Sequence, residues 1–167
     1  WISSGSFVAN WSINIDPLSS IMLVVVTFVS ALVHIYSIGY MSHDPHKPRF
    51  MSYLSLFTFS MLVLVVSDNF LQLFFGWEGV GLCSYLLIGF WYKRESANNA
   101  AIKAFIVNRV GDFGLAIGIF LLFFYFGTIN FQEVFDLAPQ FIEKKIVFFG
   151  FETTLITLIC LFLFIGA

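Results

Sequence analysis

Long apolar runs separated by short polar stretches limit what this chain can fold into. Five runs approach or exceed the ~20 residues that an α-helix needs to cross the hydrocarbon of a bilayer. They lie at about 18–40, 50–66, 70–91, 98–126 and 147–167. Only 11% of the residues are charged, whereas a soluble domain carries roughly 25%. The sequence therefore predicts an all-α, polytopic transmembrane bundle of about five membrane-spanning helices.

The first sixteen residues differ from the rest because polar and apolar residues partly alternate in them, notably over 7–15. Alternation is typical of a strand, so we expect 1–16 to be an extramembrane loop with a short strand or β-hairpin. Asp16 and Pro17 then form a good helix start, because Asp can cap and Pro at the first helical position loses no hydrogen bond. From 17 to 167 we expect one transmembrane helical domain.

A long polar segment, 127–145, separates the fourth apolar run from the fifth. It contains a small amphipathic pattern over 131–137, which predicts a short helix. The fifth spanning helix is expected to start near Val147. Glu152 then falls in its first turns, where a carboxylate interacts favourably with the helix dipole, so we expect a capping role for it.

The loops between the runs alternate in charge. Residues 42–50 and 92–103 are basic, whereas the other loops are neutral or acidic. Basic loops stay on the inner side of a membrane. The sequence thus predicts that these two loops lie inside and that the N-terminus lies outside.

Neither end of the chain looks like the end of a complete protein. The chain begins at Trp1 rather than Met, and it stops at Ala167 inside an apolar run. We therefore expect an internal piece of a longer protein, with a transmembrane domain that is incomplete at its C-terminal end.

The composition argues against several other functions. A net charge of −2 gives no indication of nucleic-acid binding. Cys83 and Cys160 both lie in apolar runs and are interpreted as packing residues rather than a disulfide or a metal site. His43, Asp44 and His46 offer some metal ligands, but a closed site needs about four, and neighbouring prolines favour an interfacial turn. We expect this chain to bind no cofactor and no metal.

Glu78 stands near the middle of the 70–91 run, where a charge is costly unless it is paired or functional. Helical spacing places it on one face with Gly81, Leu82 and Tyr85. The adjacent face consists of small residues that let another helix approach closely, namely Gly76, Gly79 and Cys83. The carboxylate is therefore expected to point into a helix bundle. Either it makes a structural hydrogen bond to a neighbouring helix, or it has a functional role, which is the default for an ionisable residue in a membrane.

Three further charged residues lie in the 98–126 run. Arg109 and Asp112 are three residues apart, so they can pair along the helix. For Arg109 this self-neutralisation explains the residue as well as a functional role does, whereas Asp112 lies a turn deeper and is favoured as functional. Lys103 either extends back to the inner surface or opens a polar track from it.

His34, near the inner end of the first helix, can gain and lose a proton near neutral pH and so could pass protons. A hydrogen-bonded interfacial histidine explains it equally well. Burial favours the neutral form of a carboxylic acid, and a nearby cation favours the ionised form. A buried acid such as Glu78 can therefore be switched by moving a cation, which is the minimum machinery of a proton relay. The sequence contains no nucleophile–base pair, phosphate loop or redox ligand set that we recognise.

These charged residues lie within segments that closely resemble NADH dehydrogenase subunit 5, the distal antiporter-like subunit of respiratory complex I. The resemblance is strongest over 76–91, which reads Gly-Trp-Glu-Gly-Val-Gly-Leu-Cys-Ser-Tyr-Leu-Leu-Ile-Gly-Phe-Trp. Further matches to the family lie at 36–41, 67–70, 103–105 and 108–112. The resemblance covers essentially the whole chain and is weakest over 131–152.

The resemblance implies that the chain runs from the loop before the third helix of a larger subunit to the middle of its seventh. Glu78 would be the family's main proton-channel acid, and Asp112 its helix-six aspartate. The family's helix-seven lysine, which tunes that glutamate, would follow Ala167. A second half-channel and a long lateral helix would also lie outside the chain.

The resemblance further implies an enzyme subunit, namely the proton-translocating membrane subunit of an NADH:quinone oxidoreductase. Partner subunits would hold NADH, FMN, iron–sulfur clusters and quinone, and this chain would bind none of them. Its partners would be other complex I membrane subunits, especially the adjacent antiporter-like subunit, and the lipid bilayer. It would be a multi-pass protein of a bacterial or a mitochondrial inner membrane, and the sequence leaves open which.

Two other functions are compatible with the same residues. The large subunit of a multi-subunit cation/proton antiporter, or of a membrane-bound hydrogenase, shares the buried acid, although the 83–91 continuation favours complex I. A purely structural membrane subunit would instead use its buried charges as paired scaffolding. The genes next to this one would distinguish the antiporter or hydrogenase from complex I. The effect of neutralising Glu78 and Asp112 would distinguish a structural subunit from a proton-translocating one.

Overall fold

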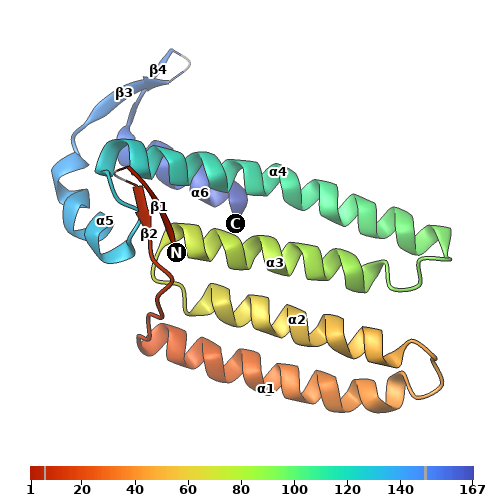
Figure 1. Ribbon diagram of the computed structural model, residues 1–167. Helices are drawn as coiled ribbons and strands as arrows, with labels where there is room; N and C mark the ends of the chain where they lie inside the picture. The colour runs from red at the N-terminus through yellow and green to blue at the C-terminus, as the bar shows by residue number, and fades with distance from the viewer. Residues whose placement is uncertain (6, 149) are drawn as a thin grey trace. The chain divides into compact units, whose positions relative to one another are not determined.

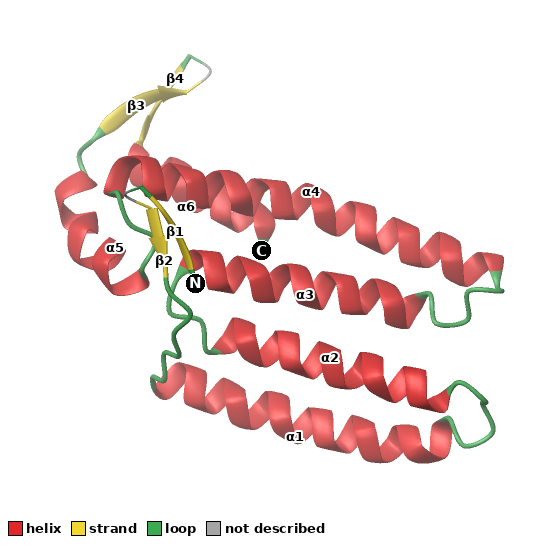
Figure 2. Cartoon of the chain, viewed as in Figure 1, coloured by secondary structure: helices red, strands yellow, loops and turns green. Residues whose placement is uncertain are grey.

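A computed structural model describes residues 1–5, 7–148 and 150–167 of a mainly helical chain (Figure 1, Figure 2). Four helices are long and apolar enough to cross a membrane, namely α1 (Pro17–Tyr40), α2 (Lys47–Val65), α3 (Phe70–Ile88) and α4 (Glu95–Phe126). A further apolar helix, α6 (Leu155–Gly166), has 12 residues. The predicted all-α transmembrane architecture is confirmed, and the chain is a multi-pass membrane protein.

Two short hairpins lie outside the helices (Figure 2). Strand β1 (Ile2–Ser4) pairs antiparallel with β2 (Phe7–Ala9), and β3 (Lys145–Phe148) pairs antiparallel with β4 (Phe151–Thr154). The first hairpin falls within 1–16, where residues alternate in polarity. The division of the chain into an extramembrane loop and a transmembrane domain at residue 16 stays a prediction.

The segment between α4 and β3 holds the helix α5 (Phe131–Leu137) and the 3-10 helix η1 (Ala138–Phe141). The backbone of α5 matches the amphipathic pattern over the same residues. Asn130 begins the helix, because its side-chain oxygen accepts a hydrogen bond from the backbone N–H of Gln132 at 3.0 Å.

The last helix starts later than the sequence predicts. The apolar run suggests a start near Val147, but Lys145–Phe148 and Phe151–Thr154 form the strands β3 and β4, and α6 begins at Leu155. The hairpin is rich in β-branched residues, which favour strands. Gly150 has a φ of +85°, which no helix contains. Thr154 then caps α6 with its hydroxyl oxygen.

The capping role predicted for Glu152 is wrong for the same reason. This residue lies in β4 and precedes α6. Its Oε2 is 3.9 Å from Nζ of Lys145 on the paired strand, and both side chains are 72% exposed. An ion pair between such exposed groups contributes little to stability.

Three other helix ends differ from the predicted boundaries by three residues. Helix α2 begins at Lys47 rather than 50, α3 ends at Ile88 rather than 91, and α4 begins at Glu95 rather than 98. Polar residues extend the helix starts beyond the apolar runs. Pro48 is tolerated in the first turn of α2, and the charge of Glu95 suits the start of α4.

The chain divides into two compact units. Unit 1 comprises Trp1–Ser12, Asp68–Phe74 and Arg109–Ala167, and unit 2 comprises Ile13–Ser67 and Phe75–Asn108. Helices α3 and α4 each contribute residues to both units. Each unit has its own packing, and the candidate site residues are divided between them.

In unit 2, α1 begins as the sequence predicts. The N–H of Ser19 donates to Oδ1 of Asp16 at 2.6 Å, and the N–H of Asp16 donates to Oγ of Ser19 at 2.7 Å. This reciprocal capping satisfies two backbone donors, and Pro17 occupies the first turn without losing a hydrogen bond.

The small-residue face of α3 packs against α2 within unit 2. A Cβ atom added to Gly76 would lie 2.7 Å from the backbone nitrogen of Leu64. A Cβ atom added to Gly79 would lie 2.7 Å from Oγ of Ser60, and Sγ of Cys83 lies 3.9 Å from the same oxygen. The close helix approach predicted for this face is therefore observed, and α2 is the partner.

The loop between α1 and α2 is fixed by Asp44. Its Oδ1 accepts a hydrogen bond from the N–H of His46 at 2.7 Å, and its Oδ2 accepts one from Nε1 of Trp91 at 3.0 Å. The bond from His46, followed by the bond from Trp91, lowers the pKa of Asp44. The carboxylate therefore forms a turn and joins the two loops predicted to lie inside.

In unit 1, α4 and α6 approach each other closely at glycines. A Cβ atom on Gly114 would lie 2.6 Å from Cγ2 of Ile165, and one on Gly111 would lie 3.3 Å from the carbonyl oxygen of Ile165. On the side of α6, a Cβ atom added to Gly166 would lie 2.5 Å from Cβ of Leu115 on α4. The two helices can therefore touch only because these side chains are absent.

The core of unit 1 lies where α4, α5 and α6 meet. Leu122, Val134, Leu155 and Ile159 are buried there, and Phe70 at the start of α3 packs against them. This contact holds the short amphipathic helix α5 against the two apolar helices.

Polar side chains join three connecting segments of unit 1. Nδ2 of Asn69, before α3, donates to the carbonyl oxygen of Asn10 at 2.8 Å. Asp68 Oδ2 accepts hydrogen bonds from Oγ of Ser12 at 2.8 Å and from Nδ2 of Asn130 at 3.1 Å. The N-terminal segment, the α2–α3 hinge and the α4–α5 connection are thus fixed to one another.

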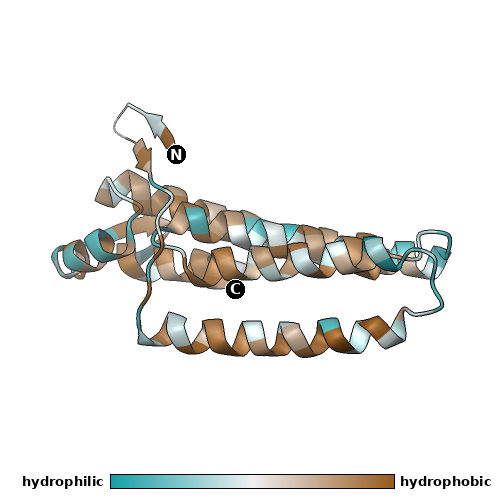
Figure 3. Cartoon of the chain, turned by 60° about the horizontal axis from the view of Figure 1, so that its bottom comes forward, coloured by the Kyte–Doolittle hydropathy of each residue, from teal (hydrophilic) through white to brown (hydrophobic). Residues whose placement is uncertain are grey.

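Most of the apolar surface of the spanning helices is not covered by the chain itself. Of the most apolar 18-residue stretch of α1 only 6% is buried, and of the corresponding stretch of α4 33% is buried. In Figure 3 the helices are mostly brown, and much of the teal gathers in the connections at their ends. Lipid or other protein must cover these helices.

The glycine contact between α3 and α2 predicts a local loss of stability on substitution. Gly76→Ala places a Cβ atom against the backbone of Leu64 and should destabilise the protein by about 1–3 kcal/mol. We expect a lower melting temperature and less assembled protein. Gly81→Ala is the matched control, because no described atom lies within 4 Å of its added Cβ. Equal effects of the two substitutions would contradict the close contact.

The turn at Asp44 predicts a pH-independent effect near neutrality. A lowered pKa means that the stabilisation by the carboxylate is complete above the unfolded value of 3.8 and is lost only as the pH falls through the folded value. The difference in melting temperature between the wild type and Asp44→Asn should therefore be constant between about pH 5 and pH 8. A difference that shrinks toward pH 5 would mean that the pKa of Asp44 is raised rather than lowered.

Candidate functional site

Glu78 lies in the middle of α3 and belongs to unit 2. The middle residue of Phe70–Ile88 is its neighbour Gly79, and the Glu78 side chain is half-buried. Gly76 and Gly79, on either side of it, are the residues that hold α3 against α2. The acid is therefore positioned by a tight helix contact.

Arg109 and Asp112 form the ion pair that their spacing predicts. Nη1 of Arg109 lies 3.6 Å from Oδ2 of Asp112, one turn apart on the part of α4 in unit 1. The Asp112 side chain is 8% exposed and that of Arg109 is 48% exposed. The acid is thus buried beside a cation that reaches the surface of the unit.

Lys103 lies on the first half of α4, in unit 2, and its side chain is exposed. It follows the helix start at Glu95 by about two turns. Both interpretations of this lysine, return to the inner surface and a polar track, stay predictions.

His34 is the centre of a polar cluster between α1 and α2, which we call the His34 cluster (Ser30, His34, Ser55 and Thr58). Its Nδ1 lies 2.8 Å from the carbonyl oxygen of Ser30, and its Nε2 lies 3.3 Å from Oγ of Ser55. Ser30 Oγ lies 2.7 Å from Oγ1 of Thr58. The histidine is half-buried and hydrogen-bonded, as a structural interpretation requires.

The His34 cluster can accommodate either charge state of the imidazole. The hydroxyls of Ser55 and Thr58 donate to backbone carbonyls one turn before them at 3.0 Å. While they do so, both ring nitrogens of His34 have acceptors, as the protonated ring needs. If the hydroxyl of Ser55 rotates to donate to Nε2, the neutral ring is satisfied. Hydrogen-bond partners are therefore available to both charge states of the ring, which differ by the rotation of one hydroxyl group.

Sequence reasoning missed the three hydroxyl residues of the His34 cluster. Their signal is present, because Ser30 and His34 are four residues apart on α1 and Ser55 and Thr58 are three apart on α2. Polar residues at these spacings in apolar runs mark polar faces. Which two faces meet depends on how α1 and α2 are aligned, and the spacing does not contain that information.

Over residues 1–5, 7–148 and 150–167, no group of three or more His, Cys, Asp or Glu side chains could hold a metal ion. Cys83 is buried, Cys160 is exposed, and both are free thiols. Asp44 forms a turn, as described above.

The chain matches two protein-family models, which together cover most of its length. Residues 1–51 match the model described as NADH-Ubiquinone oxidoreductase (complex I), chain 5 N-terminus. Residues 67–167 match the model described as NADH:quinone oxidoreductase/Mrp antiporter, TM. Both matches agree with a polytopic, antiporter-like membrane fold.

Individual relatives agree with the family models. Over 167 residues the chain is 60% identical to NADH-ubiquinone oxidoreductase chain 5 of Chondrus crispus, a match that covers 100% of this chain and 25% of the relative. NADH-quinone oxidoreductase subunit L of Rickettsia bellii is 60% identical over 166 residues, with 99% and 26% covered. Chain 5 of Triticum aestivum is 60% identical over 167 residues, with 100% and 25% covered.

The fold and these matches define a segment of an antiporter-like membrane protein. The chain belongs to the family of NADH-ubiquinone oxidoreductase chain 5 and NADH-quinone oxidoreductase subunit L. It spans about a quarter of the length of the curated relatives it matches. The resemblance found in the sequence is confirmed.

The ion pair on α4 predicts non-additive effects of substitution. Arg109→Gln and Asp112→Asn each remove one member of the ion pair, and the double variant removes both. Because Arg109 is half-exposed, each change should destabilise the protein by less than the about 3–5 kcal/mol of a fully buried pair. The double variant should be more stable than the sum of the two single effects predicts.

This prediction is checked by melting temperature and by the amount of assembled complex for all three variants. Additive effects would mean that the pair contributes nothing to stability. A matched control is the exposed pair of Lys145 and Glu152, whose neutralisation should change neither quantity measurably.

Proposed function

We propose that this chain is part of the proton-translocating membrane subunit of an NADH:quinone oxidoreductase, and that Glu78 takes up and releases the proton. The observation that carries the proposal is an acid at the middle of an apolar spanning helix, in a chain that belongs to the chain 5 and subunit L family. An ionisable group at that depth marks an ion or proton pathway more often than a structural bond.

The proposed mechanism is electrostatic. In apolar surroundings the neutral form of a carboxylic acid is favoured, and an approaching cation favours the ionised form. A change in the distance between Glu78 and a cation would therefore load or release its proton. Electron transfer in partner subunits would drive that change, and the glycines beside Glu78 support the mechanism because they fix the helix that carries it.

The other polar groups take secondary roles in this proposal. Asp112 would be a second protonatable acid, and Arg109 would adjust its charge through their ion pair. Lys103 would either extend back to the inner surface or open a polar track from it. His34 would pass a proton through the His34 cluster, which is supported by the two hydrogen-bonding states available to its ring.

The proposal also assigns partners and cofactors. Other subunits would bind the cofactors and the quinone substrate, namely NADH, FMN, iron–sulfur clusters and quinone. This chain is proposed to bind none of them. The other membrane subunits of the complex, including the adjacent antiporter-like subunit, and lipid would cover the apolar helices that the chain leaves exposed.

A second function is favoured by one observation, the description of the matched family model, which names the Mrp antiporter beside the oxidoreductase. In that case the same buried acids would exchange a cation for a proton without electron transfer. The names of the relatives, all oxidoreductase chains, favour the first function. Proton transport that requires sodium and no NADH would favour the second.

The role of Glu78 predicts a separation of pumping from assembly. In the complete complex, Glu78→Gln keeps the size and hydrogen-bonding capacity of the side chain but removes its proton exchange. We expect the number of protons pumped per NADH oxidised to fall by this subunit's share, while the amount of complex stays close to that of the wild type.

Pumping is measured as acidification per NADH oxidised in membrane vesicles, beside complex content from the same membranes. Glu152→Gln is the matched control, because that glutamate is 72% exposed outside the helices, and it should pump normally. Normal pumping by Glu78→Gln would show that the assigned role is wrong. Loss of assembly with normal pumping per assembled complex would favour the purely structural function.

A further inference from the structure

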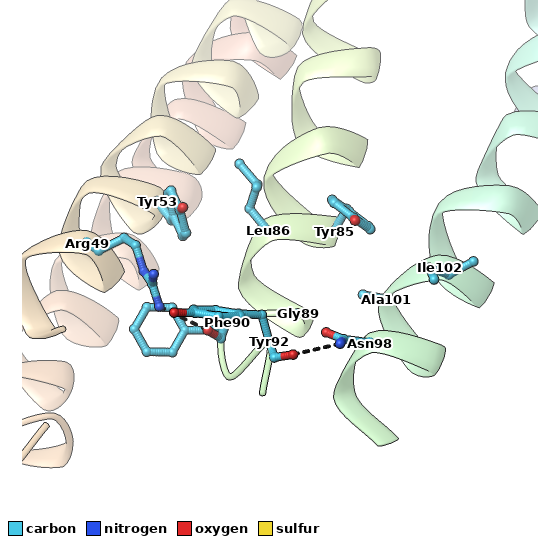
Figure 4. A pocket seen from close by; sticks show the side chains of 10 residues that line it. All are labelled: Arg49, Tyr53, Tyr85, Leu86, Gly89, Phe90, Tyr92, Asn98, Ala101 and Ile102. Atoms are coloured by element: carbon cyan, nitrogen blue, oxygen red, sulfur yellow. Dashed lines mark hydrogen bonds between the residues drawn. The ribbon is translucent and has the colours of Figure 1, made fainter. Parts of the chain in front are cut away.

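A cavity of about 390 Å³ lies within unit 2 at the end of the helices nearest the two basic loops. Figure 4 shows its lining, which comes from α2, α3, α4 and the connection between α3 and α4. None of the proposed proton-carrying residues lines it. The lining consists of Arg49, Tyr53, Tyr85, Leu86, Gly89, Phe90, Tyr92, Asn98, Ala101 and Ile102.

Arg49 is the charged residue of the cavity, and among the described residues the nearby carboxylate of Asp44 acts on it only through longer-range attraction, without an ion pair. Its Nη2 donates to the carbonyl oxygen of Phe90 at 3.1 Å. Its guanidinium carbon lies 4.7 Å from the centroid of the Phe90 ring and 5.3 Å from that of Tyr92. These contacts orient the guanidinium but leave its full positive charge without an ionic partner among the described residues.

One donor of this guanidinium has no acceptor. Nε of Arg49 is buried and makes no hydrogen bond within the part of the chain that the structure describes. A buried donor without a partner destabilises a protein, and more so when it is charged. An oxygen atom of a ligand in this cavity could accept the hydrogen bond from Nε. An anionic oxygen would also neutralise the charge of the guanidinium.

The remaining lining is apolar and aromatic. Arg49 lies in the first turn of α2 and Leu86 in the last turn of α3, whereas Ile102 lies about two turns into α4. A ligand that fills this space therefore needs an anionic end at Arg49 and a hydrocarbon part beside Leu86 and Ile102. Inorganic phosphate satisfies only the first requirement, and a neutral lipid satisfies only the second.

The charge of the surrounding loops favours the same class of ligand. The loops 42–50 and 92–103 together contain five basic residues, and Asp44 and Glu95 are their two acids. Basic segments beside spanning helices attract anionic lipid headgroups. Tyr92 at the rim is of the residue type that lies at the level of the headgroups.

We propose that this cavity binds an anionic phospholipid, with a phosphate oxygen at Nε of Arg49 and an acyl chain beside Leu86 and Ile102. The lipid joins α2, α3 and α4 at the inner end of unit 2. This site is separate from the proposed proton pathway, so its test does not depend on pumping.

The test uses the complete complex, stripped of loosely bound lipid in mild detergent. Phosphatidylglycerol, phosphatidylcholine and inorganic phosphate are added separately, and the melting temperature is measured at each concentration. For the wild type we expect phosphatidylglycerol to raise the melting temperature, with smaller effects of phosphatidylcholine and phosphate. Equal effects of the two lipids would overturn the anionic specificity, and an equal effect of phosphate would show a free-anion site instead of a lipid site.

Arg49→Gln tests the assigned residue. We expect the phosphatidylglycerol concentration for half-maximal stabilisation to rise roughly fivefold, the ratio expected for one basic residue lost beside an anionic lipid. The phosphatidylglycerol that remains with the complex, counted by mass spectrometry, should fall by one molecule per complex. A lipid count and a concentration dependence equal to those of the wild type would overturn the proposal.

Arg94→Gln is the matched control. Arg94 belongs to the same basic end and lies over the ring of Trp91, with its guanidinium carbon 5.4 Å from the centroid, but it does not line the cavity. This variant should bind phosphatidylglycerol as the wild type does. An equal loss in both variants would show that general surface charge, and not the cavity, holds the lipid. If Arg49→Gln fails to assemble, the comparison of the three additives on the wild type still decides the proposal.

Discussion

Close approach of helix backbones at glycine residues is the contact on which the rest of this structure depends. In a bilayer, apolar side chains gain little by leaving lipid for protein, so helices associate through tight packing at small residues. Gly76 and Gly79 provide this packing for α3 on α2 in unit 2. Gly111 and Gly114 provide it for α4 on α6 in unit 1. Each unit therefore contains a pair of helices that approach each other closely at glycines.

The same two glycine pairs surround the half-buried Glu78 and the buried Asp112. Glu78 lies between the glycines of α3, and Asp112 lies between those of α4. A helix that touches its neighbour through backbone atoms has little freedom to rotate or slide, so the position of each carboxylate is fixed along its helix. A group that exchanges protons benefits from such fixation, because its electrostatic surroundings then change only when charged groups move.

The spanning helices could be predicted because hydrocarbon leaves an apolar run of this length few alternatives to a helix. The hairpin of β3 and β4 could not be predicted, because a short apolar run does not distinguish a strand from a helix. The deciding feature is the positive φ of Gly150, which the sequence pattern does not reveal. Glu78 could be predicted as a site residue from its charge alone. The contact of His34 with Ser55 could not be predicted, because it depends on the alignment of two helices.

The contact between α4 and α6 also limits how this sequence can vary over evolutionary time. Glycine is the smallest amino acid, so every replacement at Gly114 or Gly166 adds at least one carbon atom toward the other helix. Elsewhere in the two helices, one apolar residue can drift into another of similar volume without changing the helix separation. At these two positions no such neutral exchange exists, and a change can persist only if a residue across the contact, such as Ile165 or Leu115, becomes smaller at the same time.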